Sequence, residues 1–193
     1  MTEESDLLAR LKKGVSREAA FRELVVQYQE RLYWHIRRIV ITHEDADDVL
    51  QETLIKVFRN IEGFKGESKL YSWMYRIATN ESLTFLNRRS RMRGISNEEL
   101  QDHLVQNLEA DPYFDGDHAE LELQKALSTL PEKQRLVFNL KYFEALKYNE
   151  ISEILETSVG GLKASYHLAV KKVEKYLKGE TQDVKNPEIK PFE

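Results

Sequence analysis

The sequence predicts an all-α protein: two small helical domains joined by an acidic flexible linker, the second containing a helix-turn-helix. Three observations support this class. Apolar residues recur every three or four positions over most of the chain, as in amphipathic helices. Only eight glycines and four prolines occur in 193 residues, and every proline follows position 111. Residues 1–89 have a formal net charge of +1 and residues 90–129 of −6, so an acidic stretch separates two helical blocks.

The first domain, residues 1–89, is predicted to contain four helices. Ser5 and Ser16 are of the residue type that caps helix N-termini, and we expect them to begin the first two. Gly63 and Gly66 break the pattern before the fourth helix. The predicted ranges are 5–13, 16–39, 43–61 and 70–89.

Residues 90–117 lack sustained periodicity and contain most of the acidic excess, so we expect a linker there. The second domain, residues 118–178, resumes the helical pattern, with Pro131 opening one of its helices. The polar tail 179–193 is predicted to be disordered.

The sequence has no cysteine, no signal-peptide pattern and no apolar run long enough for membrane insertion. We therefore expect a cytoplasmic protein.

Residues 148–177 have the spacing of a helix-turn-helix, with a break at Glu156 and Thr157. In the second helix of this motif a stripe from Val159 to Val173, including Tyr166, is predicted to be buried. The small and polar residues off that stripe can approach DNA, because helix N-termini bind phosphate. The alternative is a generic helical hairpin with a frayed start. The candidate DNA-binding residues are Ser158, Gly160, Gly161, Lys163, Ser165, His167 and Lys171.

The helix that opens at residue 70 interleaves aromatic residues with basic and amide side chains. Such a mixture suits melted nucleic acid, whose unstacked bases are held by rings and pockets. The alternative is that the aromatic stripe is core; on either reading we expect Trp73 to be largely packing and Asn80 to be exposed. The candidate residues, including the preceding loop, are Phe64, Lys65, Ser68, Lys69, Tyr71, Trp73, Arg76 and Asn80.

A cluster of carboxylates in the third predicted helix raises five possibilities: a structural role, a metal site, acid–base catalysis, DNA binding and a basic protein partner. Asp45, Asp48, Glu52 and Lys56 share a polar stripe opposite an apolar stripe that includes Leu50, Leu54 and Val57. A purely structural role is open, because acids favour a helix N-terminus and Glu52 can pair with Lys56. No His-x-x-His or Glu-x-x-His pattern supports a metal site, and no nucleophile supports catalysis. Phosphate would be repelled, which leaves a basic protein partner. We therefore predict no catalytic residue, metal or cofactor.

Four motifs occur in order along the chain, and together they resemble the extracytoplasmic-function (ECF) sigma factors of bacteria, in the sigma-70 family. They are DADDVLQETLIKVF (45–58), WMYRIATN (73–80), LPEKQRLVFNLKYF (130–143) and YNEISEIL (148–155), the last followed by a Ser-Val-Gly helix start. The match covers about residues 5–178. It implies that the first domain docks on core RNA polymerase at its clamp and opens the minus-ten promoter element. It also implies that the second domain reads the minus-thirty-five element, and that the linker runs through the polymerase towards the flap and RNA exit path.

The resemblance makes the carboxylate helix the polymerase-binding surface. Asp48, Gln51 and Glu52 match the family's contact positions, and Asp45 and Lys56 lie beside them on the polar stripe. It further implies promoter DNA and an anti-sigma factor as partners, and no enzymatic activity.

The chain departs from many relatives at two places. Glu156 stands where many have glycine, and two positions of the last helix, Ser165 and Leu168, lack the arginine that many carry. We therefore expect more backbone and shape readout of DNA. A stand-alone helix-turn-helix regulator and a metal-dependent carboxylate enzyme remain the alternatives.

Overall fold

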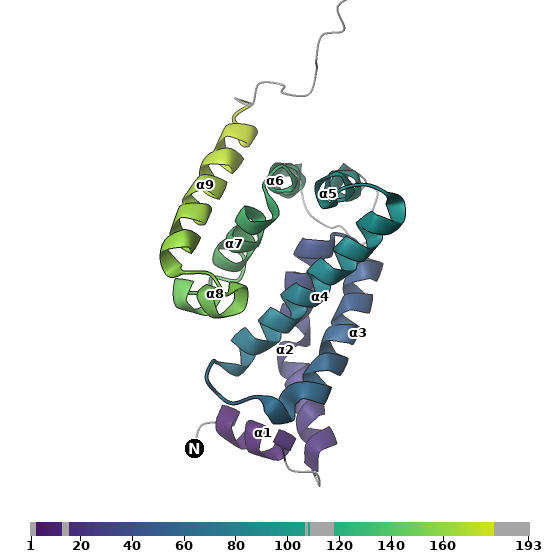
Figure 1. The fold of residues 1–193 in the computed structure, drawn as a ribbon, viewed down its shortest axis with the longest axis vertical. Coiled ribbons are helices and arrows are strands. Elements are labelled where there is room, and N and C mark those ends of the chain that lie inside the picture. The colour runs from purple at the N-terminus through teal and green to yellow at the C-terminus, as the bar shows by residue number, and fades with distance from the viewer. Residues whose placement is uncertain (1–2, 13–15, 107, 109–117, 180–193) are drawn as a thin grey trace, which may run out of the picture.

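The computed structural model describes residues 3–12, 16–106, 108 and 118–179, and the regular structure of these residues is helical throughout (Figure 1). The all-α prediction is confirmed. The helices are α1 (Glu3–Lys12), α2 (Arg17–Val40), α3 (His43–Asn60), the short 3-10 helix η2 (Ile61–Gly63), α4 (Leu70–Arg93), α5 (Asn97–Gln106), α6 (His118–Ser128), α7 (Glu132–Tyr142), α8 (Tyr148–Leu155) and α9 (Val159–Leu177).

Helices α2, α3 and α4 pack against one another, and α1 lies across one end of them (Figure 1). Ser5 lies inside α1, so the prediction that it caps this helix is wrong. The buried face of α3 is formed by Ala46, Val49, Thr53 and Val57. Leu50 and Leu54 of the predicted stripe are only half-buried. Ala46, Val57 and Ile61 are buried as predicted, whereas in the middle of the helix the neighbours Val49 and Thr53 are buried instead, because both α2 and α4 cover α3.

The helix-turn-helix is formed by α8 and α9. Between them Glu156 adopts the left-handed conformation, with φ 50° and ψ 41°. Ser158 caps α9 as predicted, since its Oγ accepts a hydrogen bond from the backbone N–H of Gly161 at 3.3 Å. Tyr166 is half-buried and stacks on Phe138, with ring centroids 5.9 Å apart.

The acidic segment contains a helix that we did not predict. Helix α5 occupies residues 97–106, so the expectation of no sustained helix there is wrong. Its start is a capping box: Ser96 Oγ accepts from the N–H of Glu99 at 3.1 Å, and Glu99 Oε2 accepts from the N–H of Ser96 at 2.8 Å. Gln101 is buried and donates to the backbone oxygen of Ile39 at 2.8 Å. Residues 109–117 of the predicted linker and the predicted disordered tail, residues 180–193, lie outside the described residues.

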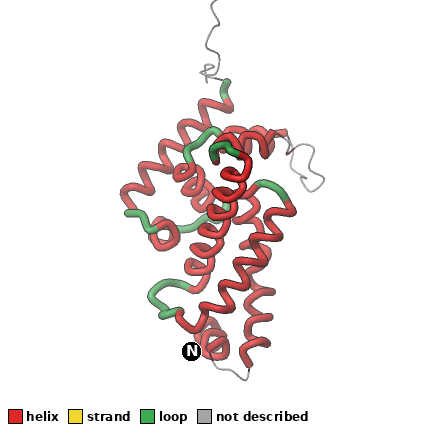
Figure 2. The backbone as a smooth tube through the Cα atoms, turned by 45° about the vertical axis from the view of Figure 1, so that its right-hand side comes forward, coloured by secondary structure: helices red, strands yellow, loops and turns green. Residues whose placement is uncertain are grey.

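The two helical units are packed together. Helix α8 lies against α4, and α7 against α2 (Figures 1 and 2). The main apolar cluster continues from α2, α3 and α4 into the second unit, where its buried members include Leu140, Leu146, Ile151 and Ile154. A smaller cluster joins α6, α7 and α9. The domain boundaries at residues 89 and 117 stay a prediction.

The loop between α7 and α8 offers a test of its backbone. Ala145 is exposed and has φ 52°, a left-handed conformation that glycine adopts without the Cβ penalty. Ala145→Gly should raise the free energy of unfolding by about 0.5–1 kcal/mol in urea denaturation. The matched control, Ala164→Gly at an exposed position inside α9, should lower it by about 1 kcal/mol. Loss of stability in both variants would contradict the left-handed loop.

Candidate functional site

The acidic surface of α3 borders a groove between α3 and α4. Asp48, Gln51 and Glu52 are exposed, and they line this groove of about 480 Å³ together with residues of α4 that include Phe85 and Arg88. The groove combines carboxylates with an aromatic ring. It therefore offers both charge and apolar area to a basic protein segment.

The other two residues predicted for this surface are engaged within the chain. Asp45 forms an ion pair with Arg89 of α4, and Lys56 Nζ lies 2.6 Å from Glu81 Oε2. The suggested Glu52–Lys56 pair is thus replaced by a pair between helices. A helical wheel of α3 alone cannot show this, because Glu81 belongs to α4. Asp45 and Lys56 fix α3 against α4, and Glu52 stays at the groove.

The aromatic part of the predicted nucleic-acid surface is mostly packed. Phe64 is only 5 % exposed and lies against Trp73, with ring centroids 5.3 Å apart. Its ring therefore packs into the core here, whereas Phe64 was predicted to be among the residues that hold unstacked bases. Asn80 is exposed and Trp73 is largely packing, as predicted. Lys65 is exposed and Ser68 half-buried on the loop before α4.

Three further residues of this predicted surface contact the second helical unit. Lys69 Nζ lies 2.8 Å from Glu150 Oε1, and Arg76 Nη1 lies 3.0 Å from Glu156 Oε1. Burial acts to raise the pKa of Glu150, but hydrogen bonds from Lys69, Tyr71 and the backbone of Lys147 lower it to about 2. Glu150 is therefore a carboxylate at neutral pH.

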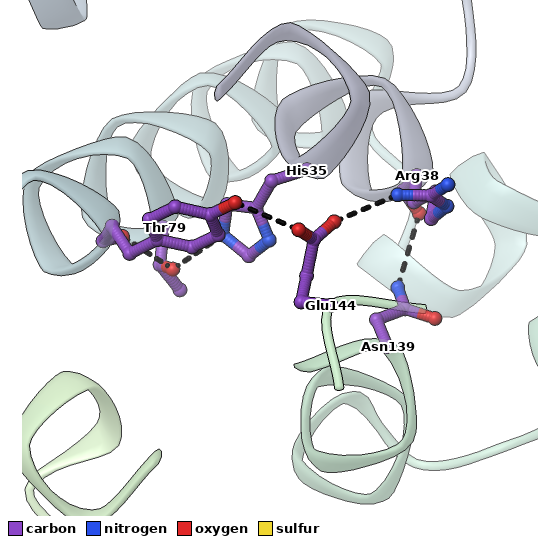
Figure 3. A network of polar contacts seen from close by, with 6 residues as sticks. His35, Arg38, Thr79, Asn139 and Glu144 are labelled. Carbon is purple, nitrogen blue, oxygen red and sulfur yellow. Dashed lines mark hydrogen bonds and ion pairs between the residues drawn. The ribbon is translucent and has the colours of Figure 1, made fainter. Parts of the chain in front are cut away.

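A buried polar junction connects α2, α4 and the end of α7 (Figure 3). The side chain of Glu144 is 8 % exposed; one oxygen accepts from Arg38 Nη1 at 2.8 Å and the other from the Tyr75 hydroxyl at 2.7 Å. Asn139 Nδ2 donates to the backbone oxygen of Arg38 at 3.5 Å. Burial lowers the pKa of Arg38 while Glu144 opposes that shift, and burial with Glu144 raises the pKa of Tyr75. The carboxylate thus receives two donors inside the protein.

His35 lies beside this junction and is fully buried (Figure 3). Its Nε2 is 2.8 Å from Thr79 Oγ1, and that hydroxyl donates to the backbone oxygen of Tyr75. Nε2 must therefore carry the proton and donate. Burial, aided by Arg38, lowers the pKa of His35 to about 3. Sequence reasoning missed this residue, although its position between Leu32 and Ile36 on the apolar stripe of α2 could have indicated it.

Helix α9 presents a basic face. Lys163, His167 and Lys171 are exposed and four residues apart, so they lie on one side of the helix. The first turn carries no acidic residue. A Cβ at Gly160 would meet open space, so this glycine leaves the backbone of the first turn bare. Gly161 lies against its own cap, where a Cβ would be 3.3 Å from Ser158 Oγ, and Ser165 is half-buried. An anion can thus reach the helix N-terminus.

Over the ranges that the structure covers, no group of three metal-ligating side chains is found. None of the described helices is both long and apolar enough to cross a bilayer.

Family models match both helical units. The sigma-70 region 2 model matches residues 24–92 and the sigma-70 region 4 model matches residues 120–173. The RNA polymerase sigma-H factor of Pseudomonas aeruginosa is 31 % identical over 92 % of this chain and 96 % of its own length. The ECF RNA polymerase sigma-E factor of Haemophilus influenzae is 31 % identical over 87 % of this chain and 92 % of its own.

Solved structures share the fold. The sigma factor RpoE of Bartonella quintana, in complex with the anti-sigma factor NepR, matches with a TM-score of 0.65, 21 % identity and coverage of 83 % of this chain and 98 % of that one. CnrH, in complex with the cytosolic domain of CnrY, matches with a TM-score of 0.67, 20 % identity and coverage of 92 % and 99 %. The chain belongs to the sigma-70 family of RNA polymerase sigma factors, in its ECF class.

The buried His35 predicts a pH dependence of stability. In the unfolded chain His35 has the ordinary histidine pKa of about 6.5, whereas in the folded protein its pKa is about 3. The unfolded state therefore binds the proton more readily at acidic pH. The free energy of unfolding should therefore fall as the pH drops below 6.5, by about 2 kcal/mol at pH 5 from this residue alone. Urea denaturation between pH 7.5 and pH 5 measures it. His35→Gln should flatten this fall, and His167→Gln, at an exposed histidine, should leave it unchanged. Equal slopes in wild type and His35→Gln would contradict the assignment.

Proposed function

We propose that this sigma factor binds core RNA polymerase through the groove between α3 and α4. The observation that carries the proposal is the exposure of Asp48, Gln51 and Glu52 along one groove. A carboxylate surface repels DNA and attracts a basic protein, and complementary charge speeds encounter and fixes register. Asp45 and Lys56 act indirectly, by holding α3 on α4 through Arg89 and Glu81.

Helix α9 is the surface proposed for duplex DNA at the minus-thirty-five element. Its exposed Lys163, His167 and Lys171 supply positive charge, and its bare first turn supplies backbone N–H groups. Because the helix presents lysine and no arginine, most of the predicted affinity comes from phosphate contacts and DNA shape.

The α4 face and its preceding loop are proposed to hold the unstacked bases of the minus-ten element. The exposed or half-buried members of the predicted set are Lys65, Ser68, Lys69, Tyr71, Trp73, Arg76 and Asn80. Capture of single-stranded bases would favour strand opening, while the polymerase performs nucleotidyl transfer. The sigma factor itself then has no catalytic activity, and it acts in the cytoplasm.

We also propose an anti-sigma protein as a partner. RpoE of Bartonella quintana was solved with its anti-sigma factor NepR, and that sigma factor shares the present fold. The same two helical units are available here for such a partner to engage.

Reversing the charge at the α3 groove should weaken polymerase binding. Asp48→Lys with Glu52→Lys should reduce the affinity for bacterial core RNA polymerase about tenfold or more, because two carboxylates facing a basic partner become cations. Gel filtration and fluorescence titration measure the complex, and circular dichroism checks the helices. The control, Glu18→Lys with Asp47→Lys, makes the same change in net charge at exposed acids outside the groove. Unchanged binding in the groove variant would make the carboxylates only a solvated face.

Removing one lysine of α9 should weaken promoter binding without changing base preference. Lys163→Ala should lower the affinity of the holoenzyme for all duplex sequences and reduce the salt slope by about one phosphate contact. Lys178→Ala is the control, because it lies about 22 Å further along the helix axis. Filter binding at several salt concentrations measures both. A variant that alters base preference with an unchanged salt slope would make Lys163 a base-reading residue.

A further inference from the structure

Three glutamates of the second helical unit, six residues apart, meet polar groups of the first. Glu144 lies before α8, Glu150 within it and Glu156 after it. Glu144 binds Arg38 and the Tyr75 hydroxyl, Glu150 binds Lys69, and Glu156 binds Arg76. One short helix and its two flanking turns therefore present a row of negative charge to α2 and α4.

We propose that this row, which we call the α8 acidic row (Glu144, Glu150 and Glu156), mimics a nucleic-acid backbone and competes with single-stranded DNA for the α4 face. This inference rests on the proposed role of α4 in holding the minus-ten strand. A lysine or arginine that pairs with a carboxylate cannot bind a phosphate in the same geometry, since both acceptors need the same N–H groups.

The geometry places the competition at the predicted DNA-binding residues themselves. Lys69 and Arg76 are two of the cations in the predicted DNA-binding set, and each forms an ion pair with a glutamate of the α8 acidic row. Asn80 is exposed, but it borders a groove of about 300 Å³ whose other wall is formed by the second unit, including Leu136 and Ile154. A DNA strand on this face must therefore displace α8.

The backbone at Glu156 is a separate observation in favour of the proposal. This residue is left-handed, with φ 50°, a conformation in which glycine would be unstrained. Its side chain contributes the carboxylate that Arg76 contacts. The turn thus contains a residue with a strained backbone, and the carboxylate of this residue forms an ion pair that joins the two units.

The other two proposed surfaces stay open in the same conformation. Asp48 and Glu52 are exposed at the α3 groove, and Lys163 and Lys171 are exposed on α9. Polymerase docking and duplex contacts therefore do not require α8 to leave α4. Binding of the single strand does, so the row delays base capture until the two units separate.

The first test measures the affinity of the full-length protein for a fluorescein-labelled pool of random single-stranded oligodeoxynucleotides. The variant Glu144→Gln, Glu150→Gln, Glu156→Gln should bind about tenfold more tightly than wild type, since the carboxylates that pair with Lys69 and Arg76 are neutralised and the charged junction that holds α8 on α4 is weakened. Because Glu144 is buried and its loss can destabilise the fold, the double variant Glu150→Gln, Glu156→Gln is measured beside it and should gain part of this affinity. Glutamine at 150 keeps the oxygen that accepts the N–H of Lys147.

The matched control neutralises three other glutamates of the second unit, Glu122, Glu153 and Glu174. Glu122 pairs with Lys125 in its own helix, and the other two are exposed. This variant has the same net charge as the triple variant, and its affinity should stay within about twofold of wild type. Adding Lys69→Ala and Arg76→Ala to the triple variant should remove its gain, which places the DNA on α4. Equal affinities of the triple, double and control variants would overturn the proposal.

A second measurement follows the separation of the units directly. The chain has no cysteine, so Arg59→Cys on α3 and Lys175→Cys on α9, both exposed, accept a dye pair specifically. Single-stranded DNA should lower the energy transfer between the dyes. DNA that binds without any change in energy transfer would overturn the proposal as well.

Polymerase binding separates the inference from the proposed function. If wild type forms a complex with core polymerase but the row variants gain no affinity for DNA, the mimicry is wrong and the proposed function stands. If the row variants gain affinity but no polymerase complex forms, the competition is real and the proposed docking function is wrong.

Discussion

The placement of the second helical unit depends on the carboxylate of Glu144, which is held between Arg38 and Tyr75. An almost buried charge is tolerated only when donors surround it, and removing one donor leaves a large desolvation cost. The two donors come from α2 and α4, so Glu144 can be satisfied only when the end of α7 lies at their crossing. The apolar contact of α8 with α4 is non-directional; this polar junction gives it a unique orientation.

Once that orientation is fixed, the charges of the molecule divide into three surfaces. The carboxylates of the α3 groove face outward, and so does the basic side of α9. Between them Lys69, just before α4, and Arg76 of α4 face the α8 acidic row. The surfaces proposed for protein, duplex and single strand are thus separate, and the one proposed for the single strand is occupied by the chain itself. The availability of the α4 face is consequently linked to the distance between the units.

Sequence reasoning succeeded where local physics decides. Most helix ranges, the Ser158 cap and the exposure of Asn80 follow from periodicity, capping and neighbouring side chains, whereas α4 extends beyond its predicted end at residue 89 to Arg93. The Ser96–Glu99 capping box is also local, so α5 could have been predicted from the sequence. The acidic charge of residues 90–117 and the glycines within them favoured a linker instead. Ion pairs such as Lys69–Glu150 join residues 81 positions apart, and no local pattern contains them. The burial of His35 and Phe64 likewise depends on which helices cover them.

Glu156 shows that the contact between the units is not arranged for maximal stability. A left-handed non-glycine residue costs about 1–2 kcal/mol, and an exposed ion pair such as Arg76–Glu156 contributes at most about 1 kcal/mol. Glycine at this position would therefore give a turn of equal or greater stability. Glu156 keeps the guanidinium of Arg76 paired, but it adds almost nothing to the free energy of folding. A phosphate can replace a contact of this kind easily, because breaking it costs little folding free energy. This is the property that the proposed control of access to α4 requires, while the buried junction maintains the fold.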